Sequence, residues 1–217
     1  MKKEKEGVIK YHLQHKNKLL PEIIDFSELN SWRSIMLQLE MIGQNPSRYE
    51  GLGFGNISQR LSENSPAFVI SGTQTGHLNP LSRNDFCLVQ TADTQTNTIN
   101  SEGPCKPSSE ALTHASVYLK ASAAQCIIHV HCPTIWLKTK QLRLAYTDQK
   151  IAYGTPEMAE AVANLIDIHA FHSGGIFSML GHEDGIVAFA PTLEQAAEFL
   201  INCLAKALRI EQTKIFL

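Results

Sequence analysis

The chain has 217 residues, of which 43% are hydrophobic, and a formal net charge of −2. This composition is ordinary for a globular protein, and the length suits one domain with a sizeable core. Near-neutral charge without a basic stripe argues against nucleic acid as a partner. No apolar run approaches the roughly 20 residues of a membrane span. The mixed charges of the first residues do not fit a secretory signal, so we expect a cytoplasmic protein with no membrane partner.

The first predicted elements are a helix and a strand. Apolar residues at intervals of three and four predict a helix from Ser27 to about Ile42, with Gly43 as its stop. The glycines of GLGFGNISQRL favour a tight turn into a strand that begins near Asn56. The chain before Ser27 is interpreted as an N-terminal extension, residues 1–26.

Short β-rich runs follow this strand. PAFVIS (66–71) and DFCLV (85–89) predict two strands, separated by the polar loop SGTQTGHLNP. TNTINSEG (96–103) is interpreted as a turn region, and Pro107 then opens a helical pattern that leads to the strand CIIHVH (126–131).

The C-terminal half continues this alternation. A helix is predicted over 155–169, with Thr155 as its cap and Pro156 at its first position. FSMLGH (177–182) and GIVAFA (185–190) predict strands, and a last helix runs from Thr192 to about residue 211. Strands in runs, with helices between them and at the ends, indicate a mixed α/β sheet covered by helices.

CIIHVH carries two histidines in an otherwise apolar run. Side chains alternate along a strand, so His129 and His131 share one face, roughly 6.5–7 Å apart. Two imidazoles at this spacing can converge on one metal ion. Taken alone, the pair is more simply explained by two histidines that are hydrogen-bonded at the sheet surface.

KPSSEALTH precedes this strand by one helix. Glu110 is expected in the first turn of that helix, and His114 one turn later on the same side. Ser108 and Ser109 fall where backbone N–H groups have no helical partner and the helix dipole is positive, which is a natural anion site. An N-cap serine with a dipole-stabilised glutamate explains the same residues structurally.

The five cysteines are odd in number and include no CxxC pair, so we expect unpaired thiols in a reducing compartment. Cys132 directly follows His131 and should point to the opposite face of the strand, which favours a core thiol over a metal ligand.

Five motifs together resemble the class II aldolase/adducin family: GNIS, SGTQTG, PSSE, HVH and a late histidine before an apolar strand. The resemblance spans roughly residues 28–205. That family includes zinc-dependent fuculose- and rhamnulose-phosphate aldolases, ribulose-phosphate epimerases, methylthioribulose-phosphate dehydratases and the non-catalytic adducin heads. It implies a single domain over 27–217, folded as a three-layer α/β/α sandwich with a central mixed, largely antiparallel sheet, and a homotetramer.

The resemblance also implies a metal site. His129 and His131 match two metal ligands, and His182 of GHEDG is the candidate third. Three neutral nitrogens with one open position are typical of a catalytic zinc site, although Mn²⁺, Fe²⁺ or Co²⁺ would also suit imidazole ligands. Glu110 matches the glutamate that serves such enzymes as a general base or fourth ligand.

By the same resemblance, neutral donors bind a phosphate of the substrate. The matching residues are Asn56, Thr75, Gly76, Ser108 and Ser109. The alternative is that Gly72 and Gly76 merely make turns.

The remaining histidines are interpreted structurally. We expect His114 to support the site or pack in the core, and His169 and His172 to lie at the surface or cap a helix. His12 and His15 belong to the charged N-terminal region and are expected to be exposed.

Three departures from the family pattern bear on the reaction. Glu183 and Asp184 follow His182 where the family has glycine, and they could act as further bases or form a turn. The segment after His131 is short, and no tyrosine follows Tyr153, where the aldolases have one that donates a proton.

The resemblance leads us to expect a metal-dependent lyase that cleaves a small hydroxy-carbonyl compound, for which a sugar phosphate is one candidate. A dehydratase or epimerase using the same metal is the first alternative. A non-catalytic scaffold like the adducin heads is the second.

Overall fold

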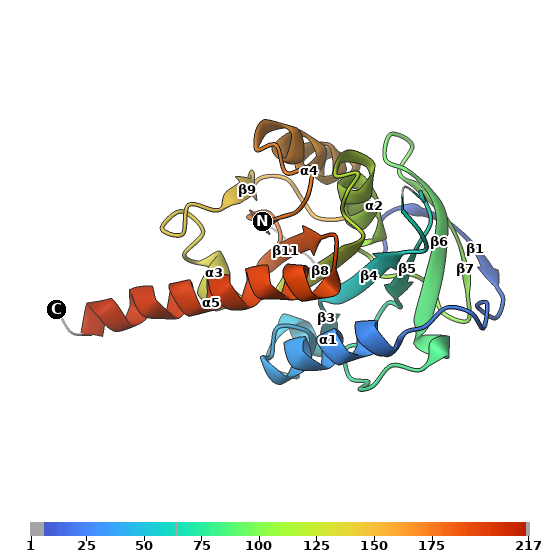
Figure 1. Ribbon diagram of the computed structural model, residues 1–217, viewed down its shortest axis with the longest axis horizontal. Helices are drawn as coiled ribbons and strands as arrows, with labels where there is room; N and C mark the ends of the chain where they lie inside the picture. The colour runs from blue at the N-terminus through green and yellow to red at the C-terminus, as the bar shows by residue number, and fades with distance from the viewer. Residues whose placement is uncertain (1–6, 64, 216–217) are drawn as a thin grey trace.

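The computed structural model describes residues 7–63 and 65–215. Within these residues one nine-stranded sheet forms the centre of the molecule (Figure 1). Its strands, in spatial order, are β1 (His12–Asn17), β7 (Thr98–Gly103), β6 (Phe86–Asp93), β5 (Phe68–Ser71), β4 (Asn56–Arg60), β8 (Cys126–His131), β11 (Gly185–Ala190), β10 (Gly175–Met179) and β9 (Ala145–Thr147). The outer pairs β1–β7 and β9–β10 are parallel and the inner pairs are antiparallel, which confirms the predicted mixed, largely antiparallel sheet.

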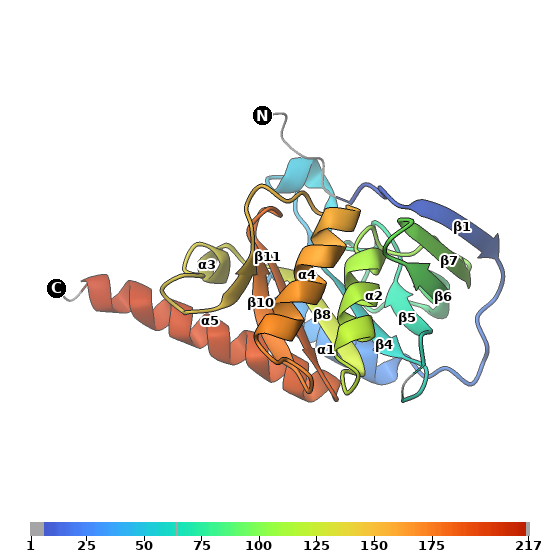
Figure 2. The same cartoon turned by 90° about the horizontal axis from the view of Figure 1, so that it is seen from above.

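Helices cover both faces of the sheet (Figures 1 and 2). The helices on one face are α2 (Ala111–Lys120) and α4 (Pro156–Ile168), and those on the other are α1 (Ser27–Gln38) and α5 (Leu193–Ile215). The short elements are β2 (Gly43–Gln44), η1 (Tyr49–Gly51), β3 (Gly53–Phe54), η2 (Arg83–Asp85) and α3 (Pro133–Trp136). The predicted three-layer arrangement is therefore confirmed.

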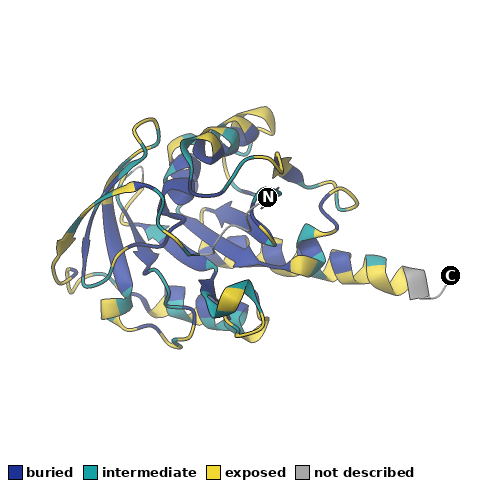
Figure 3. Cartoon of the chain, turned by 180° about the vertical axis from the view of Figure 1, so that it is seen from behind, coloured by how far each residue is buried: buried dark blue, intermediate teal, exposed yellow. Residues whose placement is uncertain are grey.

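The strands at the centre of the sheet, among them β8 and β11, consist of buried residues (Figure 3). Ile127 packs in the core beneath α2 and α4, whereas Ile128 and Val130 pack in the core beneath α1 and α5. A strand that is covered on both faces gains from a continuous apolar run, which explains why β8 is apolar apart from its two histidines.

Two boundaries differ from the sequence prediction. Helix α1 ends at Gln38 rather than near Ile42, because Glu40 adopts a positive φ of 55° and turns the chain. The strand predicted over 177–182 ends at Met179, and the following residues form the turn into β11. The N-cap of α4 agrees with the prediction, since the Thr155 side chain accepts a hydrogen bond from the Met158 amide.

The interpretation of 96–103 as a turn region was wrong, because residues 98–103 form β7. This strand pairs with β6 on one side and β1 on the other, so ladder hydrogen bonds compensate for its polar composition. Its partner β1 lies within the segment predicted as an N-terminal extension, and adds an edge strand to the same sheet. His12 is exposed there, while His15 is half-buried, with Nδ1 3.0 Å from the Ser101 hydroxyl.

All five cysteines are unpaired. Cys132 packs in the core beneath α1 and α5, as predicted for a side chain that points away from His131. None of the described helices is both long and apolar enough to cross a membrane.

Candidate metal centre and anion pocket

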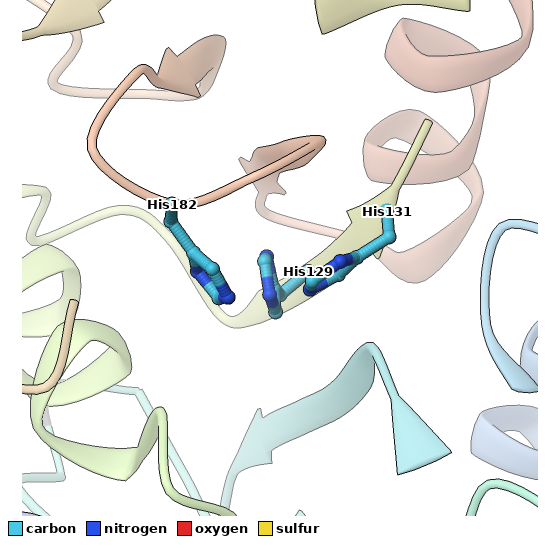
Figure 4. Close-up of side chains that lie close together, drawn as sticks. All are labelled: His129, His131 and His182. Carbon is cyan, nitrogen blue, oxygen red and sulfur yellow. The ribbon is translucent and has the colours of Figure 1, made fainter. Parts of the chain in front are cut away.

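Three histidines meet at the end of the central strand β8. His129 and His131 project from β8, and His182 comes from the turn between β10 and β11 (Figure 4). One ring nitrogen of each residue lies within 4.8 Å of the others, and the three side chains are buried. The structure thus brings the three predicted ligands together, and their role as ligands stays a prediction.

The chemistry of this histidine triad fits a divalent metal. Burial, reinforced by the positive charges that His182, His129 and Arg48 can carry, holds the pKa of His131 well below its usual range. Its ring is therefore neutral near pH 7, which is the form that binds metals. The Nδ1 atom of His129 lies 3.1 Å from the carbonyl oxygen of Ile186. In the tautomer that donates this bond the Nε2 lone pair is the ligand, the arrangement commonly found around metal ions.

A carboxylate lies beside the triad. Glu110 is the N-cap residue of α2, one position before the first turn in which we expected it. Its Oε1 atom is 3.7 Å from Nδ1 of His182, and its Oε2 atom accepts a hydrogen bond of 2.9 Å from the Thr113 hydroxyl. Only 1% of the residue is exposed. Glu110 is thus fixed close to the candidate metal site.

A polar cluster contacts the triad at His131. The Tyr49 ring meets the His131 ring edge-on at 4.7 Å, and its hydroxyl donates to Asp184 at 2.5 Å. Arg48 donates both to the Tyr49 hydroxyl and to the backbone carbonyl of His131. Burial and the bond to Asp184 raise the pKa of Tyr49. Tyr49 was not predicted from the sequence, because no spacing relates it to residues that follow it by more than 80 positions.

The two acidic residues after His182 differ in their surroundings. Glu183 is exposed, whereas Asp184 has a positive φ of 63° within the turn and accepts the bond from Tyr49. A turn-forming role for Asp184, one of the two possibilities raised from the sequence, agrees with this geometry.

The predicted phosphate-binding residues also gather in one place. A small pocket is lined by Gly7, Gly53, Gly55, Asn56, Gly72, Thr73, Gln74, Thr75, Gly76, Ser108 and Ser109. Asn56 pairs directly with His129 across the β4–β8 ladder, so this anion pocket adjoins the triad.

Glycine and short side chains make this pocket possible. A Cβ at Gly76 would lie 2.1 Å from the Gly43 carbonyl oxygen, so no other residue fits there. The Asn56 amide donates to the Ser108 hydroxyl at 2.9 Å, and the Glu110 amide donates to the same hydroxyl at 3.3 Å. Phosphate binding by these residues stays a prediction.

The other histidines lie apart from the triad. His114 is fully buried, with Nδ1 2.7 Å from the Ser58 hydroxyl, and burial lowers its pKa to about 3. This is the core position foreseen as one of its two alternatives. His169 and His172 are exposed, with His169 as the C-cap of α4.

Comparison with known proteins places the chain in a family. Residues 47–211 match the family described as the class II aldolase and adducin N-terminal domain. A methylthioribulose-1-phosphate dehydratase of Methylococcus capsulatus is 31% identical over 116 residues, which are 54% of this chain and 50% of that protein. The match therefore spans half the length of that relative.

Solved structures share the fold. An L-fuculose 1-phosphate aldolase superposes with a TM-score of 0.63 at 18% identity, over 90% of this chain and 89% of that chain. The L-fuculose-1-phosphate aldolase of Thermus thermophilus gives 0.62 at 16% identity, over 88% and 94%. These identities establish the fold alone, whereas the family match covers more than half of the chain. The chain therefore belongs to the class II aldolase and adducin N-terminal domain family.

Proposed function

We propose that the protein is a metal-dependent lyase that breaks a carbon–carbon bond in a small hydroxy-carbonyl compound carrying a terminal phosphate. The observation that carries this proposal is the histidine triad, with its nitrogens within 4.8 Å of one another and the Glu110 carboxylate 3.7 Å from His182. We expect Zn²⁺ as the ion, and Mn²⁺, Fe²⁺ or Co²⁺ would suit the same nitrogens.

His129, His131 and His182 would hold the ion. Once bound, a divalent ion would polarise the carbonyl and hydroxyl oxygens of the substrate and stabilise the negative charge that cleavage leaves on them. Glu110 would accept the proton of the hydroxyl group on the carbon that leaves as an aldehyde. The electron pair of the broken bond then stays with the carbonyl fragment, to whose carbon Glu110 would return the proton. Thr113 steadies the carboxylate through Oε2, while Oε1 is directed toward His182.

The anion pocket would bind the phosphate without a lysine or arginine. Ser108 and Ser109 precede α2, where amide groups point outward and the helix dipole favours negative charge. Because Asn56 adjoins His129 in the sheet, a substrate that is held by its phosphate would present its carbonyl end to the triad. Ser108→Ala should raise KM for a phosphorylated substrate about tenfold, which corresponds to one lost hydrogen bond.

Dehydration is the second candidate reaction, and the named function of the curated relative favours it. In that reaction Glu110 would take a proton from the carbon beside the carbonyl and pass it to the hydroxyl on the next carbon, which would then leave as water. Epimerisation would need the same residues, whereas a non-catalytic scaffold would need none of them.

Metal content and product analysis test the proposal. Protein purified without added metal should contain about one divalent ion per chain, measured by inductively coupled plasma mass spectrometry. Incubation with a panel of sugar phosphates, followed by NMR, separates the reactions. Dihydroxyacetone phosphate would indicate cleavage, and loss of water without chain shortening would indicate dehydration. Absence of both metal and turnover would refute the enzymatic proposal and favour a scaffold.

We also propose that the protein works in the cytoplasm as a homotetramer. The unpaired thiols suit a reducing compartment, and the tetramer rests on the family resemblance. Light scattering coupled to size-exclusion chromatography would measure the mass directly, and a monomer would contradict the tetramer.

A further inference from the structure

The segment Gly7–Tyr11, here called the N-terminal strap, touches both halves of the candidate site. It lies outside the residues that match the family, 47–211. It directly precedes β1, an edge strand of the sheet. Its hydrogen bonds and ring contacts join it to the anion pocket and to Tyr153 beside the triad.

On the anion side, the strap forms part of the pocket wall. Gly7 lines the pocket together with Ser108 and Ser109, and the Thr73 hydroxyl donates to the Gly7 carbonyl at 3.4 Å. At the other end of the strap, the Tyr11 hydroxyl donates to the Ser108 carbonyl at 2.8 Å. Tyr11 is buried, so this end is fixed in the core.

On the metal side, the strap holds a tyrosine against the triad. The Tyr153 ring stacks on the His182 ring, with centroids 4.4 Å apart and planes at 17°. The Val8 amide lies 3.4 Å from the Tyr153 hydroxyl, to which it donates. The Lys10 ammonium donates to the Tyr153 carbonyl at 2.9 Å and lies 3.7 Å from the ring centroid, which is a cation–π distance.

The strap is also anchored away from the site. The Asn97 side chain donates to the Lys10 carbonyl at 3.2 Å, and the His12 amide donates to the Asn97 carbonyl at 2.7 Å. Asn97 belongs to the turn between β6 and β7. The strap is therefore hydrogen-bonded both to the site residues and to the β6–β7 turn.

We infer that the N-terminal strap is a working part of the site: it positions His182 for the ion through Tyr153, and it forms a wall of the anion pocket that admits only a small terminal anion. Lys10 and Tyr153 are positioning residues in this scheme, and Gly7 is part of the pocket wall. The inference rests on the proposed metal site and anion pocket.

Cobalt binding tests the metal side, because the visible absorption of Co²⁺ reports ligand geometry independently of turnover. The parent protein is compared with four variants: Tyr153→Leu, Tyr153→Phe, Lys10→Met and Lys16→Met. Removing the ring should raise the Co²⁺ dissociation constant about tenfold or more and alter the spectrum, as loss of a group that orients a ligand does. Lys10→Met should raise it severalfold. Tyr153→Phe keeps the stack but loses the bond from Val8, so it should raise the dissociation constant less than Tyr153→Leu does. Lys16→Met on exposed β1 should resemble the parent.

The outcomes separate this inference from the proposed function. Co²⁺ binding that is unchanged in Tyr153→Leu and Lys10→Met would overturn the positioning role while the metal site stands. Failure of the parent protein to bind Co²⁺ at all would overturn both.

Inorganic phosphate tests the pocket wall. Gly7 has a φ of +67°, which is strained for alanine, and a Cβ there would lie 1.9 Å from Nε2 of the Gln74 side chain. Because both residues line the pocket, Gly7→Ala should disturb this wall by moving the Gln74 side chain or the strap. We expect the phosphate dissociation constant, measured by calorimetry, to rise about tenfold. Gly51→Ala is the matched control, since its φ of +76° carries a similar backbone cost while only Pro46 lies near. Equal phosphate affinity in Gly7→Ala and the parent would overturn the wall, and no phosphate binding to the parent would overturn the pocket itself.

Discussion

His114 and the triad histidines are all buried imidazoles, yet they occur in opposite settings. His114 is 0% exposed and its Nδ1 lies 2.7 Å from Ser58, which in turn bonds the Tyr118 hydroxyl. The triad rings lie against one another, with centroid separations of 4.7–5.2 Å, and beside a carboxylate. Burial therefore does not distinguish a candidate ligand from a core histidine. What distinguishes the candidate ligands is that the nitrogens of several histidines lie close to one another.

The largest effect on metal content and activity should come from replacing a triad histidine, compared with the same replacement at His114. His129→Gln removes one of three nitrogens and should reduce metal content to a small fraction of an ion per chain. Activity should fall at least about 10⁴-fold, because the charge stabilisation of several kcal/mol that the ion supplies is lost. Metal analysis and steady-state kinetics on the substrate found by NMR would measure both.

His114→Gln is the matched control for this prediction. It replaces an equally buried imidazole by the same amide, and it should keep the metal of the parent protein. Equal metal loss in the two variants would show that the triad is not a distinct site and that both substitutions act by unfolding the protein.

The second largest effect should follow from Glu110→Gln. The amide keeps the shape of the side chain and can still bond Thr113, but it cannot accept a proton. We expect metal content to be unchanged and kcat to fall about 10²–10⁴-fold, the usual contribution of a general base. Stopped assays at saturating substrate would measure kcat. Glu183→Gln, at an exposed carboxylate next to His182, should retain activity; a comparable loss there would make Glu183 the base instead.

These contrasts also show how far the sequence was informative. The alternation within CIIHVH placed His129 and His131 on one face, and the geometry agrees, because period-2 alternation is a local property of any strand. His182 could be paired with them only through the family resemblance, since about 50 residues separate it from β8. The five anion-pocket residues were likewise found through motif order.

What local pattern could not provide was the set of contacts between distant segments. Tyr49 reaches Asp184 across the fold, and the strap reaches Tyr153, without any spacing rule that relates them. The polar strand β7 was missed for the same reason, because its stability comes from partners on both sides rather than from its own composition.

A smaller effect concerns the pH dependence of the unfolding free energy, to which His114 should make a distinct contribution. Its pKa of about 3 in the folded protein lies below the ordinary value of 6.5, so the unfolded chain takes up a proton first as pH falls. The stability it contributes is present above pH 6.5 and is lost progressively toward pH 3. Between pH 6.5 and 5 the loss should be about 2 kcal/mol.

Urea unfolding at several pH values would measure this loss. His114→Gln should lower stability at neutral pH and flatten the decline between pH 6.5 and 5 by about that amount. A decline as steep as that of the parent would assign the pH dependence to other groups.

The smallest effect concerns the polar cluster of Tyr49, Arg48 and Asp184 beside His131. It tests whether these residues help to orient the triad. Tyr49→Phe keeps the edge contact with His131 but loses the bond to Asp184 and the one accepted from Arg48. Two partly buried polar groups then lose one partner, so unfolding free energy should fall by about 1 kcal/mol. Because Arg48 also bonds the His131 carbonyl, the Co²⁺ dissociation constant should rise only a few-fold. Tyr146→Phe, at a tyrosine that is 47% exposed, is the control and should change neither quantity. A loss of stability in Tyr49→Phe with unaltered Co²⁺ affinity would mean that the cluster stabilises the β10–β11 turn but does not orient the triad.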